Sequence, residues 1–269
     1  MEVTCMNYLV TGATGHLGSK VIALKEQGVN VVPCDYLDVT SMTKAFTGQD
    51  VVIYIPSKTY EVLQRVTEFE NSIKALQKAK VASVIFVSFY ADQENNPFVM
   101  SPYYGYAPRK LATSGLNYAV IKNSLYADPL VPYLPELIER QKLIYPVGDQ
   151  AMSFITSADS AEAIASLATQ PNLRDAGQSY LLTQDQSLTM PELGKIMTKV
   201  TGHTIGYQPV TTEEFGQIYA DEGDGEELAS MYAAGALGLF NQVTPDFKTI
   251  TGHAAEDMTS FLERNYVGK

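Results

Sequence analysis

The chain has 269 residues, and its hydrophobic content of 45% is enough to bury a sizeable core. Its 19 basic and 30 acidic side chains give a net charge of -11 with no basic run, which argues against a nucleic-acid partner. Two cysteines without metal-binding spacing and 3 histidines predict no metal site. No apolar stretch is long enough to span a bilayer and no signal-peptide pattern opens the chain, so we expect a cytoplasmic protein without a membrane partner.

The first half alternates apolar, β-branched segments with segments of helical periodicity. The apolar segments are almost continuous, which predicts strands that are buried on both faces. These expected strands are 8–12, 29–35, 50–57, 83–89 and 117–124. Helices are expected between them at 41–48 and 61–81. This alternation predicts an α/β fold, with a Rossmann-like parallel sheet and helices on both of its faces.

The second half is less regular and richer in helices. Prolines interrupt the segment 128–138, which predicts a loop that leads into a short helix. Ser157 or Asp159 is expected to cap the next helix, and Thr189 is expected to cap a further helix that ends at Gly202. The remaining expectations are a strand at 179–183, a solvated acidic loop at 221–227 and a mostly helical segment from 204 onward.

We expect two interleaved lobes from this pattern. Residues 1–150 would form a Rossmann-like dinucleotide-binding domain, and residues 151–269 would form a smaller, mostly helical substrate-binding lobe. The late strand at 179–183 would return to the sheet of the first domain.

A glycine-rich turn, TGATGHLG, follows the first expected strand. The first glycine of such a turn permits a tight bend, the second lets the backbone approach a pyrophosphate, and the third lets the helix pack closely. The following helix offers free N–H groups to the phosphates, although a glycine turn without a ligand is the alternative. The residues expected to hold a dinucleotide here are Gly12, Thr14, Gly15, His16, Leu17 and Gly18.

The glycine turn and several longer segments resemble the NmrA-like, atypical branch of the short-chain dehydrogenase/reductase superfamily. Segment 35–57 is similar to the family's third strand, following helix and fourth strand, 84–130 to its active-site segment, and 180–215 to its C-terminal lobe. The branch includes NAD(P)H:quinone oxidoreductases, triphenylmethane reductases, proteins named as nucleoside-diphosphate-sugar epimerases, and a nitrogen-regulation protein that binds dinucleotides without turnover. The resemblance implies an NAD(P)-dependent oxidoreductase that acts on a small carbonyl, a quinone or a similar electron acceptor.

One part of the family pattern is shortened in this chain. The glycine-turn helix leads directly into 29–35, which matches the family's third strand, so a second strand and its helix are missing or 29–35 takes their place. In the first case Asp35 and Asp38 lie near the adenine. In the second case Asp35 hydrogen-bonds the ribose and favours NAD over NADP, because a carboxylate repels a 2′-phosphate. Either way, the shortening is expected to weaken cofactor binding.

Three residues are expected to carry the chemistry. Tyr106 and Lys110 have the spacing that the superfamily uses, in which the lysine lowers the pKa of a tyrosine that transfers the proton. Ser88 would hydrogen-bond a substrate carbonyl, and Ser57 would lie along the dinucleotide. Against this assignment, Pro108 disfavours a regular helix through the Tyr–Lys spacer, and Arg109 falls where many relatives carry their lysine.

Three functions therefore stay open from the sequence. An NAD(P)H-dependent reductase of a small molecule is favoured. A non-catalytic dinucleotide sensor or scaffold is the alternative, because the nucleotide region is short and the Tyr–Lys motif is imperfect. A nucleotide-sugar epimerase is a weaker alternative, which rests on the resemblance alone.

Overall fold

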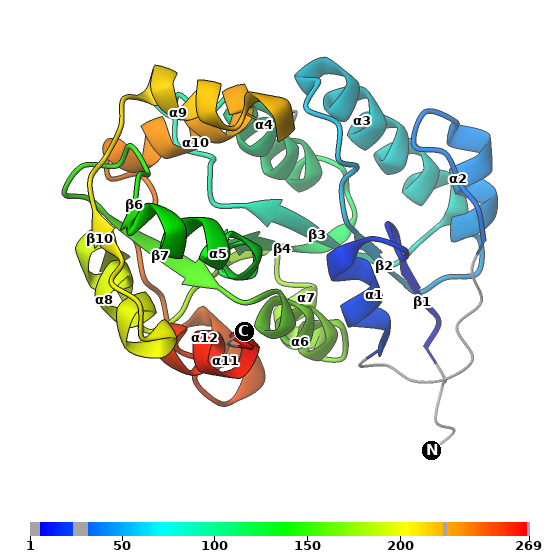
Figure 1. Ribbon diagram of the computed structural model, residues 1–269. Helices are drawn as coiled ribbons and strands as arrows, with labels where there is room; N and C mark the ends of the chain where they lie inside the picture. The colour runs from blue at the N-terminus through cyan, green and yellow to red at the C-terminus, as the bar shows by residue number, and fades with distance from the viewer. Residues whose placement is uncertain (1–5, 24–31, 223–224, 268–269) are drawn as a thin grey trace.

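A five-stranded parallel sheet lies at the centre of the molecule (Figure 1). The computed structural model describes residues 6–23, 32–222 and 225–267. In spatial order the strands are β1 (Tyr8–Val10), β2 (Val51–Tyr54), β3 (Ser83–Phe89), β4 (Asn117–Asn123) and β8 (Gln178–Leu182). Each strand runs parallel to its neighbours. The expected α/β fold with a Rossmann-like sheet is confirmed, and the late strand β8 pairs with β4.

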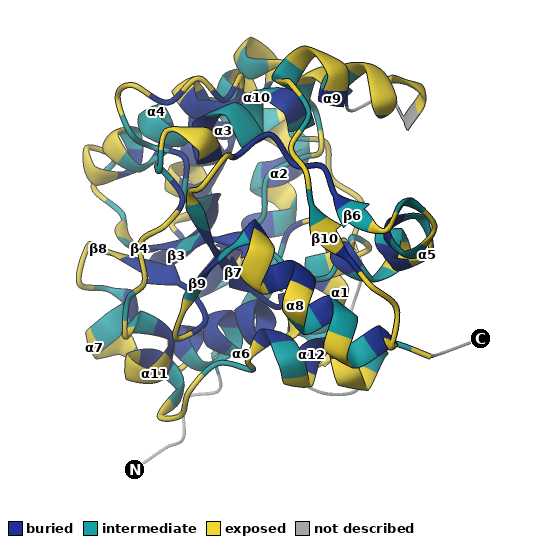
Figure 2. Ribbon diagram, turned by 60° about the vertical axis from the view of Figure 1, so that its left-hand side comes forward, coloured by how far each residue is buried: buried dark blue, intermediate teal, exposed yellow. Residues whose placement is uncertain are grey.

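Helices cover both faces of this sheet (Figure 1). One face is covered by α2 (Val39–Phe46), α3 (Val62–Ala79) and α4 (Ser101–Ala112). The other face is covered by α1 (His16–Ala23), α6 (Ser157–Ala168), α7 (Pro171–Arg174) and α11 (Asp246–Thr251). Successive residues of β3 serve the two faces in turn, because Phe86 joins the first core while Ile85 and Val87 join the second. Figure 2 shows the buried centre of the sheet against the exposed outer faces of helices such as α9 (Thr212–Ile218).

The remaining elements lie beyond the carboxyl ends of the main strands. A second sheet contains β5 (Leu125–Tyr126), β7 (Ala151–Ile155) and β9 (Ser187–Thr189). A third pairs β6 (Lys142–Leu143) with β10 (Gly206–Tyr207). The other helical segments are α5 (Leu130–Arg140), α8 (Met190–Thr201), the short 3₁₀ turn η1 (Ala220–Glu222), α10 (Gly225–Ala236) and α12 (Met258–Asn265).

The strand expected at 29–35 was wrong in its described part. Val32–Asp35 has no strand structure, and 29–31 lies outside the described residues. Pro33 has no N–H to give to a ladder, and the carboxylate of Asp35 accepts from the N–H of Leu37 at 2.8 Å. Within the described chain β1 therefore pairs only with β2 and forms an edge of the sheet.

Of the two helix caps predicted from the sequence, one was wrong and one is confirmed. The cap of α6 is Thr156, whose hydroxyl accepts from the N–H of Asp159 at 2.9 Å, so the expectation of Ser157 or Asp159 was wrong by one residue or more. The expected cap of α8 is confirmed, because Thr189 and Glu192 form a capping box and the helix ends at Gly202 with φ +73°.

Pro108 does not interrupt α4. The helix continues because Tyr103, Ala107 and Leu111 share one buried face, and this packing outweighs the backbone hydrogen bond that proline cannot make. The acidic loop expected at 221–227 is also partly wrong. Glu226 and Glu227 lie in the first turn of α10, where a negative charge is favourable, and 223–224 lies outside the described residues.

Two features are absent from the described residues. No helix there is long and apolar enough to cross a membrane. No group of three or more histidine, cysteine, aspartate or glutamate side chains there could hold a metal ion.

Candidate functional site

The glycine turn connects β1 to α1 at the carboxyl end of the sheet. Gly12 has a φ of +63°, and its carbonyl accepts from the N–H of Gly15 at 2.8 Å. A Cβ on Gly18 would lie 2.3 Å from the same carbonyl oxygen, so only glycine lets α1 pack this closely against the turn. Because α1 begins at His16, the N–H groups of its first turn have no intrahelical acceptor.

These features fit the diphosphate of a dinucleotide. Free N–H groups and the positive end of the helix dipole are what an anion binds at such a turn. Thr14 lies in the turn and Leu17 in the first turn of α1. Thr11 fixes the turn to the end of β2, since its hydroxyl donates to the carbonyl of Ile55 at 3.0 Å and accepts from its N–H at 2.8 Å.

Polar side chains hold α1 against the start of α6. Nε2 of His16 lies 3.1 Å from Oγ of Ser157, and Nζ of Lys20 donates to the same Oγ at 2.6 Å. Both also approach Asp128, at 3.5 Å from His16 and 3.2 Å from Lys20. The side chain of His16 is thus directed at α6. Hydrogen bonds from Ser157 and the charge of Lys20 outweigh burial and hold the pKa of Asp128 below its usual value.

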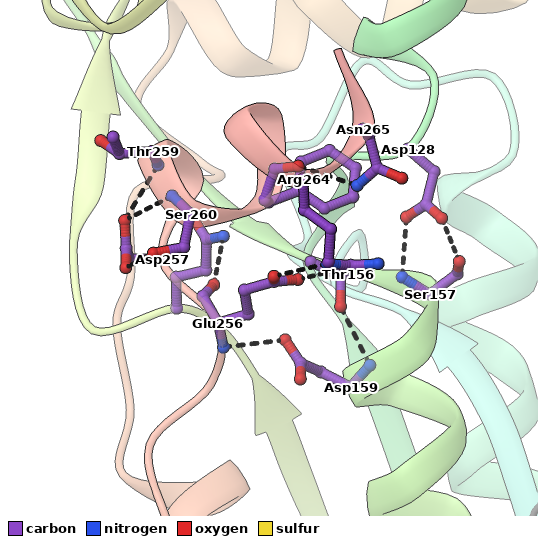
Figure 3. A network of polar contacts seen from close by, with 12 residues as sticks. Asp128, Thr156, Ser157, Asp159, Glu256, Asp257, Thr259, Ser260, Arg264 and Asn265 are labelled. Carbon is purple, nitrogen blue, oxygen red and sulfur yellow. Dashed lines mark hydrogen bonds and ion pairs between the residues drawn. The ribbon is translucent and has the colours of Figure 1, made fainter. Parts of the chain in front are cut away.

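Figure 3 shows how this contact continues to the C-terminal helix. Asp128 accepts from both the N–H and the hydroxyl of Ser157. In the same first turn of α6, Asp159 accepts from the N–H of Glu256 at 3.1 Å. The carboxylate of Glu256 pairs with Arg264 of α12 at 2.6 Å. The glycine-turn helix and the C-terminal helix are therefore both fixed to the first turns of α6.

The loop that precedes α2 supplies the side chains next to the end of β2. The Tyr36 hydroxyl donates to the carbonyl of Ile55 at 2.7 Å, and burial raises the pKa of Tyr36 to about 12. Asp35 is exposed and shapes its own turn, while Asp38 caps α2 through the N–H of Thr40 at 2.8 Å. The expected roles of Asp35 and Asp38 at the ribose or the adenine stay predictions.

Ser57 lies just after β2, and its hydroxyl is already engaged. It donates to Oε2 of Glu68 at 2.5 Å, and Oε1 of Glu68 accepts from Gln64 at 2.9 Å. Glu68 is buried on α3. Ser57 can therefore accept a hydrogen bond from a dinucleotide, but it can donate one only if its bond to Glu68 is shared or broken.

Tyr106 and Lys110 meet at Glu70 of α3. The Tyr106 hydroxyl donates to Oε1 of Glu70, and Nζ of Lys110 lies 3.0 Å from the same oxygen. The hydrogen bond to Glu70 raises the pKa of Tyr106 to about 12, which is opposite to the lowering expected from Lys110. Both residues line a cavity of about 680 Å³ between α4 and the loop at 92–96, together with Arg109.

Ser88 and Tyr104 lie nearer the carboxyl end of β3. Ser88 is 5% exposed, and its hydroxyl has no hydrogen-bond partner among the described residues. The ring of Tyr104 packs edge-on against Phe89, the last residue of β3, with centroids 5.7 Å apart. The Tyr104 hydroxyl accepts from Nη1 of Arg65 at 3.1 Å. No sequence pattern singles out Tyr104, which lies among the neighbouring Tyr103 and Tyr106, or Arg65.

The NmrA-like family model matches residues 20–261 of this chain. The chain belongs to the NmrA-like family. Quinone oxidoreductase 2 of Escherichia coli (strain K12) is 28% identical in an alignment 284 residues long, which covers 94% of this chain and 96% of the relative. NAD(P)H azoreductase of Xenophilus azovorans is 21% identical over 95% of this chain and 96% of the relative. The family predicted from the sequence is confirmed.

Solved structures of similar proteins share the whole fold. A nucleoside-diphosphate-sugar epimerase from Staphylococcus aureus superposes with a TM-score of 0.90 at 40% identity, over 96% of this chain and 100% of that chain. An NADPH-dependent quinone oxidoreductase from Escherichia coli, in complex with NADPH, gives 0.86 at 25% identity, over 96% and 99% of the chains. Triphenylmethane reductase from Citrobacter sp. gives 0.87 at 23% identity over 96% or more of both chains, which is a likeness of fold.

The predicted site residues of this NmrA-like protein fall into two groups. The glycine turn, Ser57 and Ser88 lie at the carboxyl ends of neighbouring parallel strands, where ligands bind in open α/β sheets. Tyr106 and Lys110 lie farther along α4 and contact α3. The described contacts do not bring this pair to Ser88 or to the glycine turn.

Proposed function

We propose that this NmrA-like protein is an NAD(P)H-dependent reductase of a quinone or a similar small electron acceptor. The observation that carries the proposal is the close approach of Gly18 to the Gly12 carbonyl. This packing places the start of α1 against the turn, where its free N–H groups can bind a diphosphate. The similarity to quinone oxidoreductase 2 and to NAD(P)H azoreductase over nearly the whole chain supports this class of acceptor.

The chain's own residues would divide the work by position. The N–H groups around the turn hold the diphosphate, apart from that of Gly15, which already donates to the Gly12 carbonyl. Ser88 donates its buried, unpartnered hydroxyl to the carbonyl oxygen of the acceptor. Asp35 repels a 2′-phosphate and so favours NAD over NADP. The bound cofactor supplies a hydride, and a hydroxyl on α4 supplies the proton. Tyr106 is the donor that the spacing predicts, and its hydrogen bond to Glu70 must break before it can donate to the acceptor.

The test is a binding titration followed by turnover. Thermal-shift titrations with NAD⁺, NADH, NADP⁺ and NADPH identify the cofactor, since a ligand at 100 times its dissociation constant stabilises the fold by about 2.7 kcal/mol. Oxidation of the cofactor that binds is then followed with benzoquinones, naphthoquinones and azo dyes. We expect turnover of at least one of these acceptors. Binding without turnover of any acceptor would contradict the reductase.

Two other functions also have support from specific observations. Because β1 is an edge strand in the described chain and Tyr106 is bonded to Glu70, a dinucleotide sensor without turnover is the second candidate. Binding of one cofactor with no acceptor reduced would favour it. The 40% identity to the protein named as a nucleoside-diphosphate-sugar epimerase supports the third. Conversion of a nucleotide sugar to its epimer, followed by NMR, would favour that one.

A further inference from the structure

Arg65 is a buried cation without a carboxylate partner. It is 6% exposed on α3, and among the described residues it forms no ion pair. Its Nη2 donates to the carbonyl of Thr59 at 2.6 Å, its guanidinium lies 5.4 Å from the centre of the Tyr103 ring, and its Nε has no acceptor. A buried charge without a counter-charge costs stability, so its position calls for a function.

The group that Arg65 reaches is the hydroxyl of Tyr104. Nη1 of Arg65 donates to that oxygen at 3.1 Å. No acceptor for the Tyr104 hydroxyl's own proton lies among the described residues. Tyr106 differs on both points. Its hydroxyl donates a hydrogen bond to the Glu70 carboxylate, and Lys110 pairs with that carboxylate rather than with the Tyr106 oxygen. A proton donor needs a cation near its oxygen, which stabilises the anion left behind, and a proton that is not already hydrogen-bonded elsewhere.

Tyr104 is also in the right part of the fold. It lies in the first turn of α4, and its ring contacts Phe89 at the carboxyl end of β3. The glycine turn and Ser57 follow the carboxyl ends of β1 and β2, and Ser88 lies at the end of β3. Parallel strands bring these ends to one edge of the sheet, where ligands bind in such folds.

We propose that Tyr104 is the proton donor of the proposed reductase and that Arg65 positions and stabilises it. The inference rests on the proposed function. With a hydride delivered to the acceptor by the bound cofactor, the acceptor's carbonyl oxygen takes the proton of Tyr104. The O–H bond of Tyr104 breaks as the O–H bond of the product forms. The phenolate that remains faces Arg65 and regains a proton from water.

The charged groups around the hydroxyl come from several elements. Arg65 faces it from α3 and Glu227 from α10, and the phenols of Tyr103 and Tyr126 are also close enough to interact with it. Burial raises the pKa of Tyr104, and Arg65 acts against that rise. Because the donor must be protonated, activity is lost above this pKa. Removal of the Arg65 charge should therefore move the alkaline loss of activity to higher pH.

The first experiment compares three tyrosine-to-phenylalanine variants in the same assay. We expect Y104F to lower kcat by about 100-fold or more, as loss of a general acid does, while the dissociation constant of the cofactor stays within about 2-fold. Y118F is the matched control and should keep its activity, since Tyr118 lies near the amino end of β4 and the candidate site lies at the carboxyl ends of the strands. Y106F decides between the rivals. A loss in Y106F with retention in Y104F overturns the proposal.

The second experiment tests Arg65 through the ionisation of Tyr104. In protein labelled with ¹³C at the tyrosine Cζ atoms, the Tyr104 resonance is assigned by its absence from Y104F and titrated without substrate. We expect R65Q to move its midpoint to higher pH and R65K, which keeps the charge, to restore most of it. The alkaline limb of kcat should move with the midpoint. A midpoint that is the same in R65Q and in the unsubstituted protein overturns the role of Arg65.

The outcomes separate this inference from the function on which it rests. If the unsubstituted protein reduces no acceptor, the proposed function and the inference fall together. If it reduces a quinone and Y104F does so equally well, only the inference falls.

Discussion

The edge of the central sheet at β1 and the interior strands β2 and β3 are built differently. At β1 all 3 residues are half-buried, and α1 is held to α6 by the side chains of His16 and Lys20. At β2 and β3 the strands are buried almost throughout, and aromatic rings from β2, β3, α3 and α4 pack against each other. The β1 edge, with the glycine turn, thus depends on close backbone approach and polar contacts, and the interior strands depend on apolar packing. Substitutions at the first should act on ligand binding, and substitutions at the second on stability.

The largest effect is expected on stability, in the aromatic cluster at the interior strands. Phe86 is fully buried, and its ring lies 5.0 Å from that of Phe69 and 6.3 Å from that of Tyr103. F86A should lower the free energy of unfolding by about 3–5 kcal/mol, because it leaves a cavity that rigid neighbours cannot fill. Urea unfolding measures this change. The control is L63A on α3, which removes a side chain that is 81% exposed and should cost less than about 0.5 kcal/mol. Equal losses in the two variants would contradict the comparison.

The next effect is expected at the glycine turn and in binding. In G18A the new Cβ would meet the Gly12 carbonyl at 2.3 Å, so α1 must move away from the turn. The dissociation constant of the cofactor should rise about 100-fold, which is about 2.7 kcal/mol. The control is G206A, where the nearest atom to a new Cβ is 3.7 Å away. Isothermal titration of both variants measures the change, and unaltered affinity in G18A would refute a diphosphate site here.

The same two regions, the β1 edge and the interior strands, show what the sequence could predict. The buried strands were found because their residues are continuously apolar, and the glycine turn because its three glycines lie within seven residues of chain. These are local patterns. The missing strand at Val32–Asp35 was predicted wrongly because its apolar residues outweighed Pro33 and the turn-forming Asp35 in that interpretation.

The contacts of the candidate site are not local and could not be found this way. Tyr106 meets Glu70 36 residues away, Tyr104 meets Arg65 39 residues away, and Lys20 meets Asp128 108 residues away. Spacing along one helix could select Tyr106 and Lys110 as a pair. It could not show that α3 places a carboxylate beside one tyrosine and a guanidinium beside another.

A smaller effect is expected where α1 meets α6. D128N removes the charge that Lys20 and His16 approach, and the amide oxygen still accepts a hydrogen bond. Because the pKa of Asp128 is lower in the folded protein, its charge stabilises the fold above the ordinary aspartate pKa, and this contribution is lost as pH falls through the folded value. The free energy of unfolding of the variant should be lower by about 1 kcal/mol at pH 7, and this loss should shrink as pH falls below the ordinary aspartate pKa. Thermal unfolding over a series of pH values tests this. A loss that does not shrink with acid would show that shape, not charge, holds α1.

The smallest effect is expected at Asp35, and it tests the β1 side of the comparison further. An exposed carboxylate interacts with a nearby phosphate by about 1 kcal/mol in water, so D35N should improve binding of NADPH relative to NADH about 5-fold. The asparagine oxygen can still accept from the N–H of Leu37, which preserves the turn. D149N removes an exposed carboxylate elsewhere and controls for net charge. If both variants shift the preference equally, long-range charge is responsible. If only D35N does, Asp35 lies beside the ribose, and the loop before α2 serves the nucleotide although it forms no strand.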